Sequence, residues 1–211
     1  DQDDIWLPDK ISRLVESIGH HILVYSNSTT IDEQGNSLPE KLNTKIDHID
    51  NPSFKGFLDD NFITGHTCLF KRRLLHYILP FPKDVFFYDW WMGFAASYVG
   101  QVKYLDEVLT KYRVHPKSAY RMLTTPEKKK ESWPFLKRKQ TEAFANASFL
   151  KSPDTLFIRE FLKKTDGSKT NMISLLDCFY FMLKNGKDIY PWYKKSKLKK
   201  LNFLRKKALG K

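Results

Sequence analysis

Three carboxylates crowd the start of the chain, where the sequence DQDDIWLP places Asp1, Asp3 and Asp4 directly ahead of two large apolar side chains. Acids this close repel one another, and a hard divalent cation among them would offset the repulsion through oxygen coordination. A single Asp near a helix start instead complements the helix dipole, and short acidic clusters are common on solvated loops. The spacing alone therefore leaves metal binding and a solvated cluster open.

The remaining sequence predicts the elements that must position these acids. Apolar residues at helical spacing between Pro8 and Gly19 predict a short amphipathic helix, and the uniformly apolar run after Asp89 predicts a buried helix that Asp89 caps and Gly100 ends. The predicted strands are 20–25, 62–70 and one or two within 101–115, with a turn in 31–39 centred on 34–36; the other predicted helices are 71–79, 133–150, 154–164 and 171–185.

This order predicts an α/β domain over residues 1–118, a helical extension over 119–193 and a basic tail over 194–211. With 211 residues, of which 41% are hydrophobic, the chain is long enough for one sizeable core. Cys68 and Cys178 have no metal-ligand spacing and favour a reducing, intracellular setting as buried thiols. No apolar run reaches the roughly 18 residues that span a bilayer, and we expect no signal peptide.

The net charge of +12 is concentrated at the end of the chain. Residues 194–211 carry eight lysines, one arginine and no acid, so they supply nine of the twelve charges. A helical wheel gathers Leu198, Leu201, Leu204, Ala208 and Leu209 on one side and leaves Phe203 outside. The pattern predicts an amphipathic helix for an anionic membrane, with Tyr190, Trp192 and Tyr193 as interfacial anchors; a solvated terminus is the alternative. Because the charge is terminal and no recognition motif accompanies it, we expect no nucleic-acid binding.

Four segments of the α/β region resemble, in order, those of family-two glycosyltransferases, particularly the bacterial rhamnosyltransferase-like branch. DQDDIWLPDKI resembles the segment with the DXD motif; the others are LVYSNSTTIDEQGN, ITGHTCLFKRRLL and FYDWWMGFAASYVGQVKYLDEVLTKYRVH. The resemblance covers about residues 1–118 and implies the second half of a GT-A-like mixed sheet with flanking helices. The family's nucleotide-binding half would precede Asp1, so we expect this chain to be a fragment.

The resemblance also implies roles for single residues. The DXD carboxylates, Asp1 and Asp3 with Asp4 beside them, would hold Mg²⁺ or Mn²⁺ against the donor diphosphate, where the cation neutralises the leaving group. His115 in the YRVH string would be a further metal or diphosphate contact, with a solvated side chain as the alternative. Asp89 would be the general base that takes a proton from the acceptor hydroxyl, which implies inversion at the anomeric carbon. From the residues alone, helix capping is the simpler interpretation of Asp89.

Five further residues are candidates for substrate binding. Gly65 and His66 belong to a loop that shapes the sugar pocket in the family, although turn formation explains both equally well. Arg113 lies within charge range of phosphate, and Trp90 and Trp91 offer flat faces to a sugar ring although their apolar helix favours the core.

Together these features predict an inverting, metal-dependent glycosyltransferase of bacterial surface-glycan synthesis, with a nucleotide-sugar donor and a glycan or lipid-linked acceptor. As a fragment, the chain alone should transfer little sugar. The alternative is a non-catalytic carbohydrate- or partner-binding module that keeps half of the fold. We expect a cytoplasmic location, with the basic tail favouring the inner face of the plasma membrane.

Overall fold

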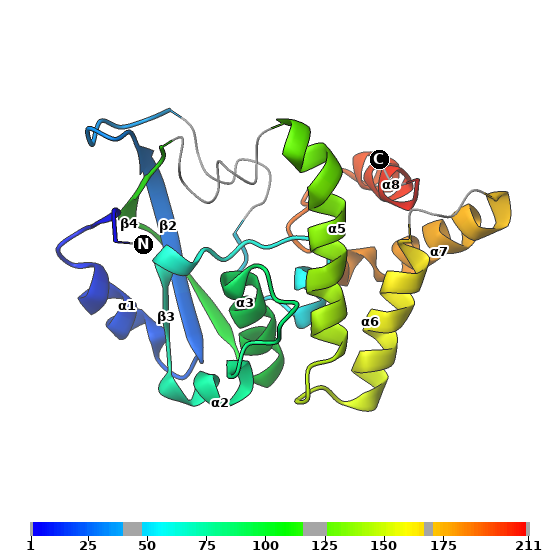
Figure 1. Cartoon of the computed structure of the whole chain (residues 1–211), viewed down its shortest axis with the longest axis horizontal. Coiled ribbons are helices and arrows are strands. Elements are labelled where there is room, and N and C mark those ends of the chain that lie inside the picture. Colours follow the sequence, from blue (N-terminus) through cyan, green and yellow to red (C-terminus); the bar gives the residue numbers. More distant parts are fainter. Residues whose placement is uncertain (1, 40–47, 116–125, 167–170, 210–211) are drawn as a thin grey trace.

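A four-stranded mixed sheet lies at one end of the molecule and a group of helices at the other (Figure 1). The computed structural model describes residues 2–39, 48–115, 126–166 and 171–209. The strand order is β1-β4-β2-β3, with bounds β1 Ile5–Trp6, β4 Val102–Arg113, β2 Leu23–Ile31 and β3 Cys68–Phe70. β4 runs parallel to β2 and antiparallel to β1, whereas β3 is antiparallel to β2.

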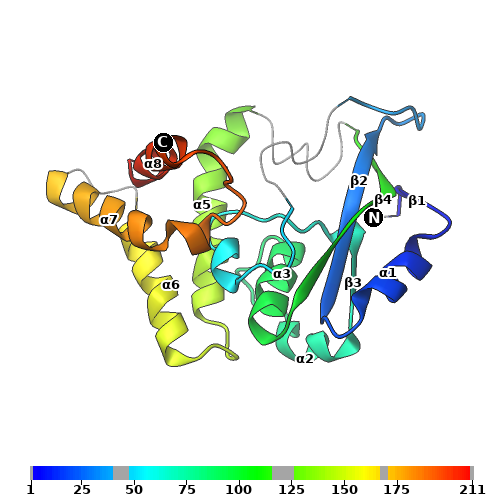
Figure 2. The same cartoon turned by 180° about the vertical axis from the view of Figure 1, so that it is seen from behind.

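This arrangement confirms the predicted fold class, a mixed α/β region followed by helices, and it is consistent with part of a GT-A-like fold. Helix α1 (Lys10–Ile18) covers one face of the sheet and helix α3 (Tyr88–Val99) the other, as the two opposite views show (Figures 1 and 2). Residues 101–115 form one long strand rather than two, with a register irregularity opposite Asn27. β4 lies between β1 and β2, and β1 pairs with β4 at Thr110 and Lys111, near the end of β4 where β2 also ends.

The first half of the sequence folds largely as its pattern predicts. Helix α1 begins shortly after Pro8 and ends at Gly19, whose φ of +43° is a conformation that favours glycine. Strand β2 includes the predicted strand end but continues to Ile31, six residues beyond the predicted limit. A turn follows, in which Asp32 Oδ1 accepts a hydrogen bond from the Asn36 N–H at 2.8 Å and Gly35 has a φ of +90°. The turn prediction is therefore confirmed.

The segment 62–79 differs from its prediction. Only Cys68–Phe70 of the expected strand pairs in the sheet, since residues Gly65–Thr67 form a 3₁₀ turn that closes with the Thr67 hydroxyl donating to the Thr64 carbonyl at 2.7 Å. The expected helix 71–79 is a 3₁₀ turn, Arg72–Leu74, followed by the four-residue helix α2 (Leu75–Ile78). The glycine and the local hydroxyl bond offered the backbone an alternative to the sheet ladder.

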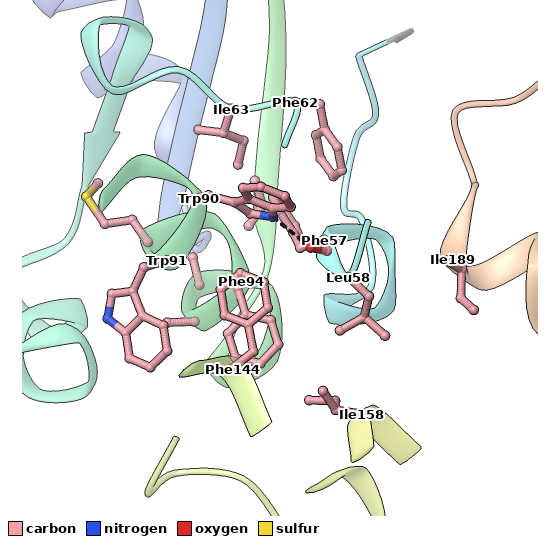
Figure 3. Close-up of a cluster of buried hydrophobic side chains, with 14 of the residues drawn as sticks. Phe57, Leu58, Phe62, Ile63, Trp90, Trp91, Phe94, Phe144, Ile158 and Ile189 are labelled. Atoms are coloured by element: carbon pink, nitrogen blue, oxygen red, sulfur yellow. Dashed lines mark hydrogen bonds between the residues drawn. The ribbon is translucent and has the colours of Figure 1, made fainter. Parts of the chain in front are cut away.

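Helix α3 is buried on nearly all sides, as its uniformly apolar sequence predicts. Figure 3 shows Trp90 with its indole N–H directed at the Phe57 carbonyl, a hydrogen bond of 2.7 Å. Phe94 stacks on Phe144 with ring centroids 4.2 Å apart. The same hydrophobic cluster runs from Leu23 in the sheet to Leu204 near the end of the chain. The helical region therefore shares one core with the α/β region.

The helical region consists of α5 (Pro126–Ala145), α6 (Ser152–Lys164), α7 (Met172–Ile189) and α8 (Lys197–Ala208). The three predicted helices are present, with α5 beginning earlier and α7 ending later than predicted. The predicted boundary near residue 118 lies outside the described residues. Within the described part of the chain, none of the helices has the length and hydropathy needed to cross a membrane.

The basic tail forms the predicted helix, but a different face is buried. Leu204 is 4% exposed and packs against Gly186 of α7, and Phe203, left outside the predicted apolar arc, stacks on Tyr193 with centroids 4.2 Å apart. Leu198, by contrast, is 80% exposed. Two of the three predicted anchors are not available to a membrane either, because Tyr190 and Trp192 are buried in the core; Tyr193 is half-buried against Phe203.

A charge cluster joins the loop before β3 to the helical region. Lys137 of α5 lies 2.8 Å from an Asp60 carboxylate oxygen, and Lys207 of α8 lies 2.5 Å from Asp59. Lys137 also donates to the backbone carbonyl of Asp59. Burial disfavours the lysine charge, but the two carboxylates overcome that cost and raise the pKa of Lys137. The cluster therefore fixes residues 59 and 60 to two helices from the other end of the molecule.

Replacing Lys137 with methionine should destabilise the fold, because it leaves two partly buried carboxylates without their main cation. We expect Lys137→Met to lower the free energy of unfolding by about 2 to 4 kcal/mol in urea titrations. Lys139→Met on the same helix is the matched control; it removes only an exposed pair with Glu142 and should cost under about 0.5 kcal/mol. Equal losses in the two variants would show that the cluster contributes nothing specific.

Candidate active site

The acidic segment at the start of the chain is held against the end of β4. The Arg113 backbone N–H donates to Asp4 Oδ1 at 2.9 Å, and the Arg113 side chain donates to the Asp3 carbonyl at 2.8 Å. His115 Nε2 lies 3.2 Å from Asp3 Oδ2. The DXD-like string and the YRVH string, more than a hundred residues apart in sequence, therefore meet at one end of the sheet.

Arg113 has a structural role at this position. Besides the Asp3 carbonyl, its guanidinium holds the carbonyls of Asp32 and Glu33 at 2.8 and 2.7 Å. These contacts fasten the acidic segment to the turn after β2. The structure thus shows Arg113 in a structural role, and its contact with phosphate stays a prediction.

Lys10 connects the acidic segment to the loop that contains His66. Its side chain is 2% exposed, its ammonium donates to the His66 carbonyl at 2.6 Å, and it lies 4.0 Å from the centre of the Trp6 ring. Burial lowers the pKa of Lys10 to about 8, with the neighbouring charge of Asp4 opposing the shift. Burial likewise raises the pKa of Asp4, against the hydrogen bond from Arg113.

The 3₁₀ turn Gly65–Thr67 lies between the acidic segment and helix α3. His66 stacks on Tyr112 with ring centroids 4.7 Å apart, and its Nε2 lies 3.1 Å from the Ser28 hydroxyl. Burial, assisted by the charge of Lys10, lowers the pKa of His66 to about 3. His66 is therefore a neutral imidazole fixed by β2 and β4, and its backbone carbonyl receives Lys10.

Asp89 lies on the other side of this turn. Its Oδ1 accepts hydrogen bonds from the Trp90 N–H at 2.7 Å and from the Asn61 side-chain amide at 3.1 Å, and its Oδ2 accepts one from the Gly65 N–H at 3.3 Å. Burial nevertheless raises the pKa of Asp89 to about 6. Asp89 lies in the first turn of α3, and the residue at the capping position is Phe87, so the predicted capping role is wrong.

Tyr88, the residue before Asp89, packs its ring against the Gly65–Thr67 turn. The pKa of its hydroxyl is raised by burial, and in addition by the charges of Asp89 and Asp4. A Cβ on Gly65 would fall 2.2 Å from the Tyr88 hydroxyl oxygen, so the glycine makes room for this ring. Lys10, which follows the acidic segment, donates to the His66 carbonyl of the same turn, and the Gly65 N–H donates to Asp89, so the Gly65–Thr67 turn connects the two parts of the site.

The structure separates the sequence-predicted site residues into two groups. It brings together Asp3, Asp4, Gly65, His66, Asp89, Arg113 and His115. It removes Trp90 and Trp91 from the site: they are 1% and 2% exposed, and the Trp91 indole donates to the Ile78 carbonyl at 3.2 Å. Neither ring is able to stack on a sugar, so their substrate-binding prediction is wrong. Asp1 lies outside the described residues.

Three residues of the site carry no signal that sequence reasoning detected. Asn61 occupies an irregular polar stretch, Tyr88 precedes the motif acid, and Lys10 follows the acidic string as one of 36 basic residues. Only the register of β1 on β4 and the position of the turn bring Lys10 to His66. For Tyr88, the one signal in the sequence was its position directly before Asp89.

The described residues at the position of the expected metal site offer a carboxylate and an imidazole, Asp3 and His115. Among residues 2–39, 48–115, 126–166 and 171–209, no group of three or more acidic, histidine or cysteine side chains is close enough to hold a metal. Mg²⁺, however, is commonly held by one or two carboxylates together with substrate phosphates and water. The Asp3 and His115 pair, with Asp4 adjacent, fits such a shared site.

Comparison with known proteins gives a coarse relationship. The chain is similar to an uncharacterized glycosyltransferase of Nostoc sp. (strain PCC 7120), with 28% identity over 133 residues. The similarity covers 54% of this chain and 38% of the relative, so the chain spans well under half of that protein. No family model matches the chain. The chain is thus related to a glycosyltransferase, at a level that does not assign a family.

The raised pKa of Asp89 should appear in the pH dependence of stability. The folded protein keeps the Asp89 proton up to a pH of about 6, whereas the unfolded chain releases it near the ordinary value of 3.8. Raising the pH from about 4 to about 7 therefore lowers the wild-type free energy of unfolding, by up to about 3 kcal/mol from this group. Asp89→Asn removes the titration, so it should gain stability relative to the wild type across this interval.

Urea unfolding at several pH values measures this difference. Tyr88→Phe is the control, because it alters the neighbouring ring and leaves the Asp89 carboxyl in place; it should keep the wild-type slope. A difference between Asp89→Asn and the wild type that is constant with pH would contradict the raised pKa.

Proposed function

We propose that this chain provides the metal-binding and acceptor-activating part of an inverting glycosyltransferase that acts on a nucleotide-sugar donor. The observation that carries the proposal is that one short turn contacts both Asp89, through the Gly65 N–H, and Lys10, which follows the Asp3 and Asp4 segment, through the His66 carbonyl. The Asp89 carboxylate is partly buried there, and its pKa is raised to about 6. The similarity to the Nostoc glycosyltransferase supports the reaction class. The resemblance of the four sequence segments to family-two transferases supports the residue roles.

In this proposal Asp89 is the general base. With a pKa of about 6 it is mostly ionised at neutral pH and is a stronger base than an ordinary Asp. Its hydrogen bonds to the backbone N–H groups of Gly65 and Trp90 hold the carboxylate in one orientation. It would take the proton from an acceptor hydroxyl as that oxygen attacks the anomeric carbon on the side opposite the diphosphate. Configuration at that carbon would then invert.

The other charged residues would act on the donor. Asp3 and His115, with Asp4 adjacent, would hold Mg²⁺ or Mn²⁺ together with Asp1, the other acid of the DXD motif, which lies outside the described residues; a cation bound there would supply charge neutralisation for the departing diphosphate. Lys10 fixes the His66 carbonyl and Arg113 fixes the acidic segment, so these two cations keep the acids and the turn in register.

The whole activity requires more than the described residues provide. This chain spans 38% of the Nostoc relative, and the family's nucleotide-binding units would precede the acidic segment. We therefore expect the 211-residue chain, assayed alone, to transfer little or no sugar. A role in bacterial surface-glycan synthesis, with a polysaccharide or lipid-linked acceptor, belongs to the same proposal. The alternative is a non-catalytic carbohydrate- or partner-binding module.

Activity measurements on a preparation that transfers sugar would test the role of Asp89. We expect Asp89→Asn to lower kcat by about 10² to 10⁴-fold, as the loss of a general base does, and wild-type kcat/KM to rise with pH through about 6. Asp84→Asn is the control, because that acid lies in the turn ahead of α3 on an exposed residue and should leave kcat unchanged. Full activity in Asp89→Asn would rule out this mechanism.

Binding of Mn²⁺ tests the metal proposal without any sugar transfer. In the isolated chain with Mn²⁺ and a nucleoside diphosphate, the NMR signals of the His115 ring should broaden strongly at low Mn²⁺. Asp3→Asn should weaken the effect by about 10-fold or more, since a coordinating carboxylate is lost. The exposed His76 on α2 is the internal control. Equal broadening of His76 and His115 would contradict a specific site.

A further inference from the structure

Helix α7 has apolar side chains on two faces, and the structure covers only one of them. Cys178, Phe181, Met182 and Ile189 are buried in the shared core. On the other face, Ile173, Leu176, Tyr180 and Leu183 follow one another at three- or four-residue intervals and are 81%, 60%, 68% and 45% exposed. We call these four residues, together with the 69% exposed Met172, the α7 stripe.

A contiguous exposed stripe of this kind is unusual for a helix at the surface. Side chains three and four residues apart lie on the same side of a helix, so the stripe is one continuous apolar strip about three turns long. A helix that is apolar on both faces is normally covered on both. Figures 1 and 2 place α7 at the end of the molecule away from the sheet, so the candidate active site does not account for the stripe.

The charges around the stripe favour one kind of binding partner over others. Both acids of α7 are paired with lysines of other elements, Asp177 with Lys164 of α6 and Asp188 with Lys55. Lys184 and Lys187 of α7 are exposed at the C-terminal end of the stripe. The rim of the stripe is therefore positive.

Helix α8 extends this positive rim. It packs on α7 through Leu204 against Gly186, one turn from Leu183, so α8 borders the stripe at that end. Its exposed side carries Leu198 and Leu201 among cations that no acid of the helix balances; the exposed cations are Lys197, Lys199, Arg205 and Lys206, preceded by Lys194 and Lys195.

We propose that the α7 stripe and the exposed side of α8 together form a docking surface for an anionic lipid bilayer. Apolar side chains would enter the boundary between headgroups and acyl chains, and the lysines around them would contact the headgroups. This surface differs from the one that the helical wheel of the tail predicts, since five of its apolar side chains come from α7 and two of the predicted anchors, Tyr190 and Trp192, are buried in the core. The proposal does not depend on the glycosyltransferase assignment.

Two other binding partners, a second copy of this chain and a nucleic acid, match the surface less well. A second copy of this chain would place the same face against itself, as symmetric dimers do, and would bring the two unbalanced rows of cations together. A nucleic acid would match the cations but not the apolar strip between them. An anionic bilayer matches both features.

Flotation of the complete chain with vesicles tests the proposal. The chain should bind vesicles of phosphatidylcholine with about 30 mol% phosphatidylglycerol at least about 10-fold more tightly than phosphatidylcholine alone, and salt should weaken the binding. The stripe variant Ile173→Ser, Leu176→Ser, Tyr180→Ser should lose about 10-fold or more of this affinity. The charge variant Lys197→Gln, Lys199→Gln, Arg205→Gln, Lys206→Gln should lose a similar factor at low salt.

Matched substitutions elsewhere keep the experiment specific. Ile11→Ser, Val15→Ser and Phe135→Ser change three exposed apolar side chains, 47%, 56% and 58% exposed, that lie on α1 and α5. This control should bind vesicles like the wild type, and circular dichroism should show all three variants folded. Unchanged binding in the stripe variant would overturn the proposal. So would sedimentation showing a dimer in the absence of lipid that the stripe variant abolishes.

Discussion

A carboxylate that is partly withdrawn from water must be held by donors, and Asp89 is held by donors from two segments of the chain. Its hydrogen bonds come from Asn61, from the Gly65 backbone and from the start of α3 itself. Burial disfavours the charge and the donors favour it, and burial prevails, which leaves the pKa at about 6. The position and the proton affinity of this one group therefore depend on the loop of residues 59–67, which is fixed at both ends.

Each end of that loop is fixed by lysines from a different part of the fold. Asp59 and Asp60 are held by Lys137 and Lys207 of the helical region, whereas the His66 carbonyl is held by Lys10, next to the acidic segment. The helical region thus helps to position the candidate base, although it contributes no group to the site. The helices also share a hydrophobic core with the sheet. This packing leaves the outer face of α7 available for a separate task, which we assign to lipid.

The sequence pattern predicted the fold class, the buried helix α3 and the turn after β2, because each depends on local periodicity or on turn residues. It did not predict that residues 65–67 form a 3₁₀ turn, since the β-branched run around them favours a strand. Solvent exposure was harder to predict. Trp90 and Trp91 belong to the core, and α8 buries Phe203 and Leu204, because the facing surfaces of α3 and α7 decide which side is covered. For the same reason Lys10 and Asn61 were missed: their partners are distant in sequence.

The central claim is that Asp89 is a carboxyl group with an unusually high affinity for protons, held by the loop that also receives Lys10 from the acidic segment. A carbon-13 NMR titration of the Asp side chains measures this most directly, with the Asp89 signal assigned through its loss in a substituted variant. The account predicts a midpoint near pH 6 for Asp89. A midpoint near the ordinary Asp value of about 3.9 would contradict it.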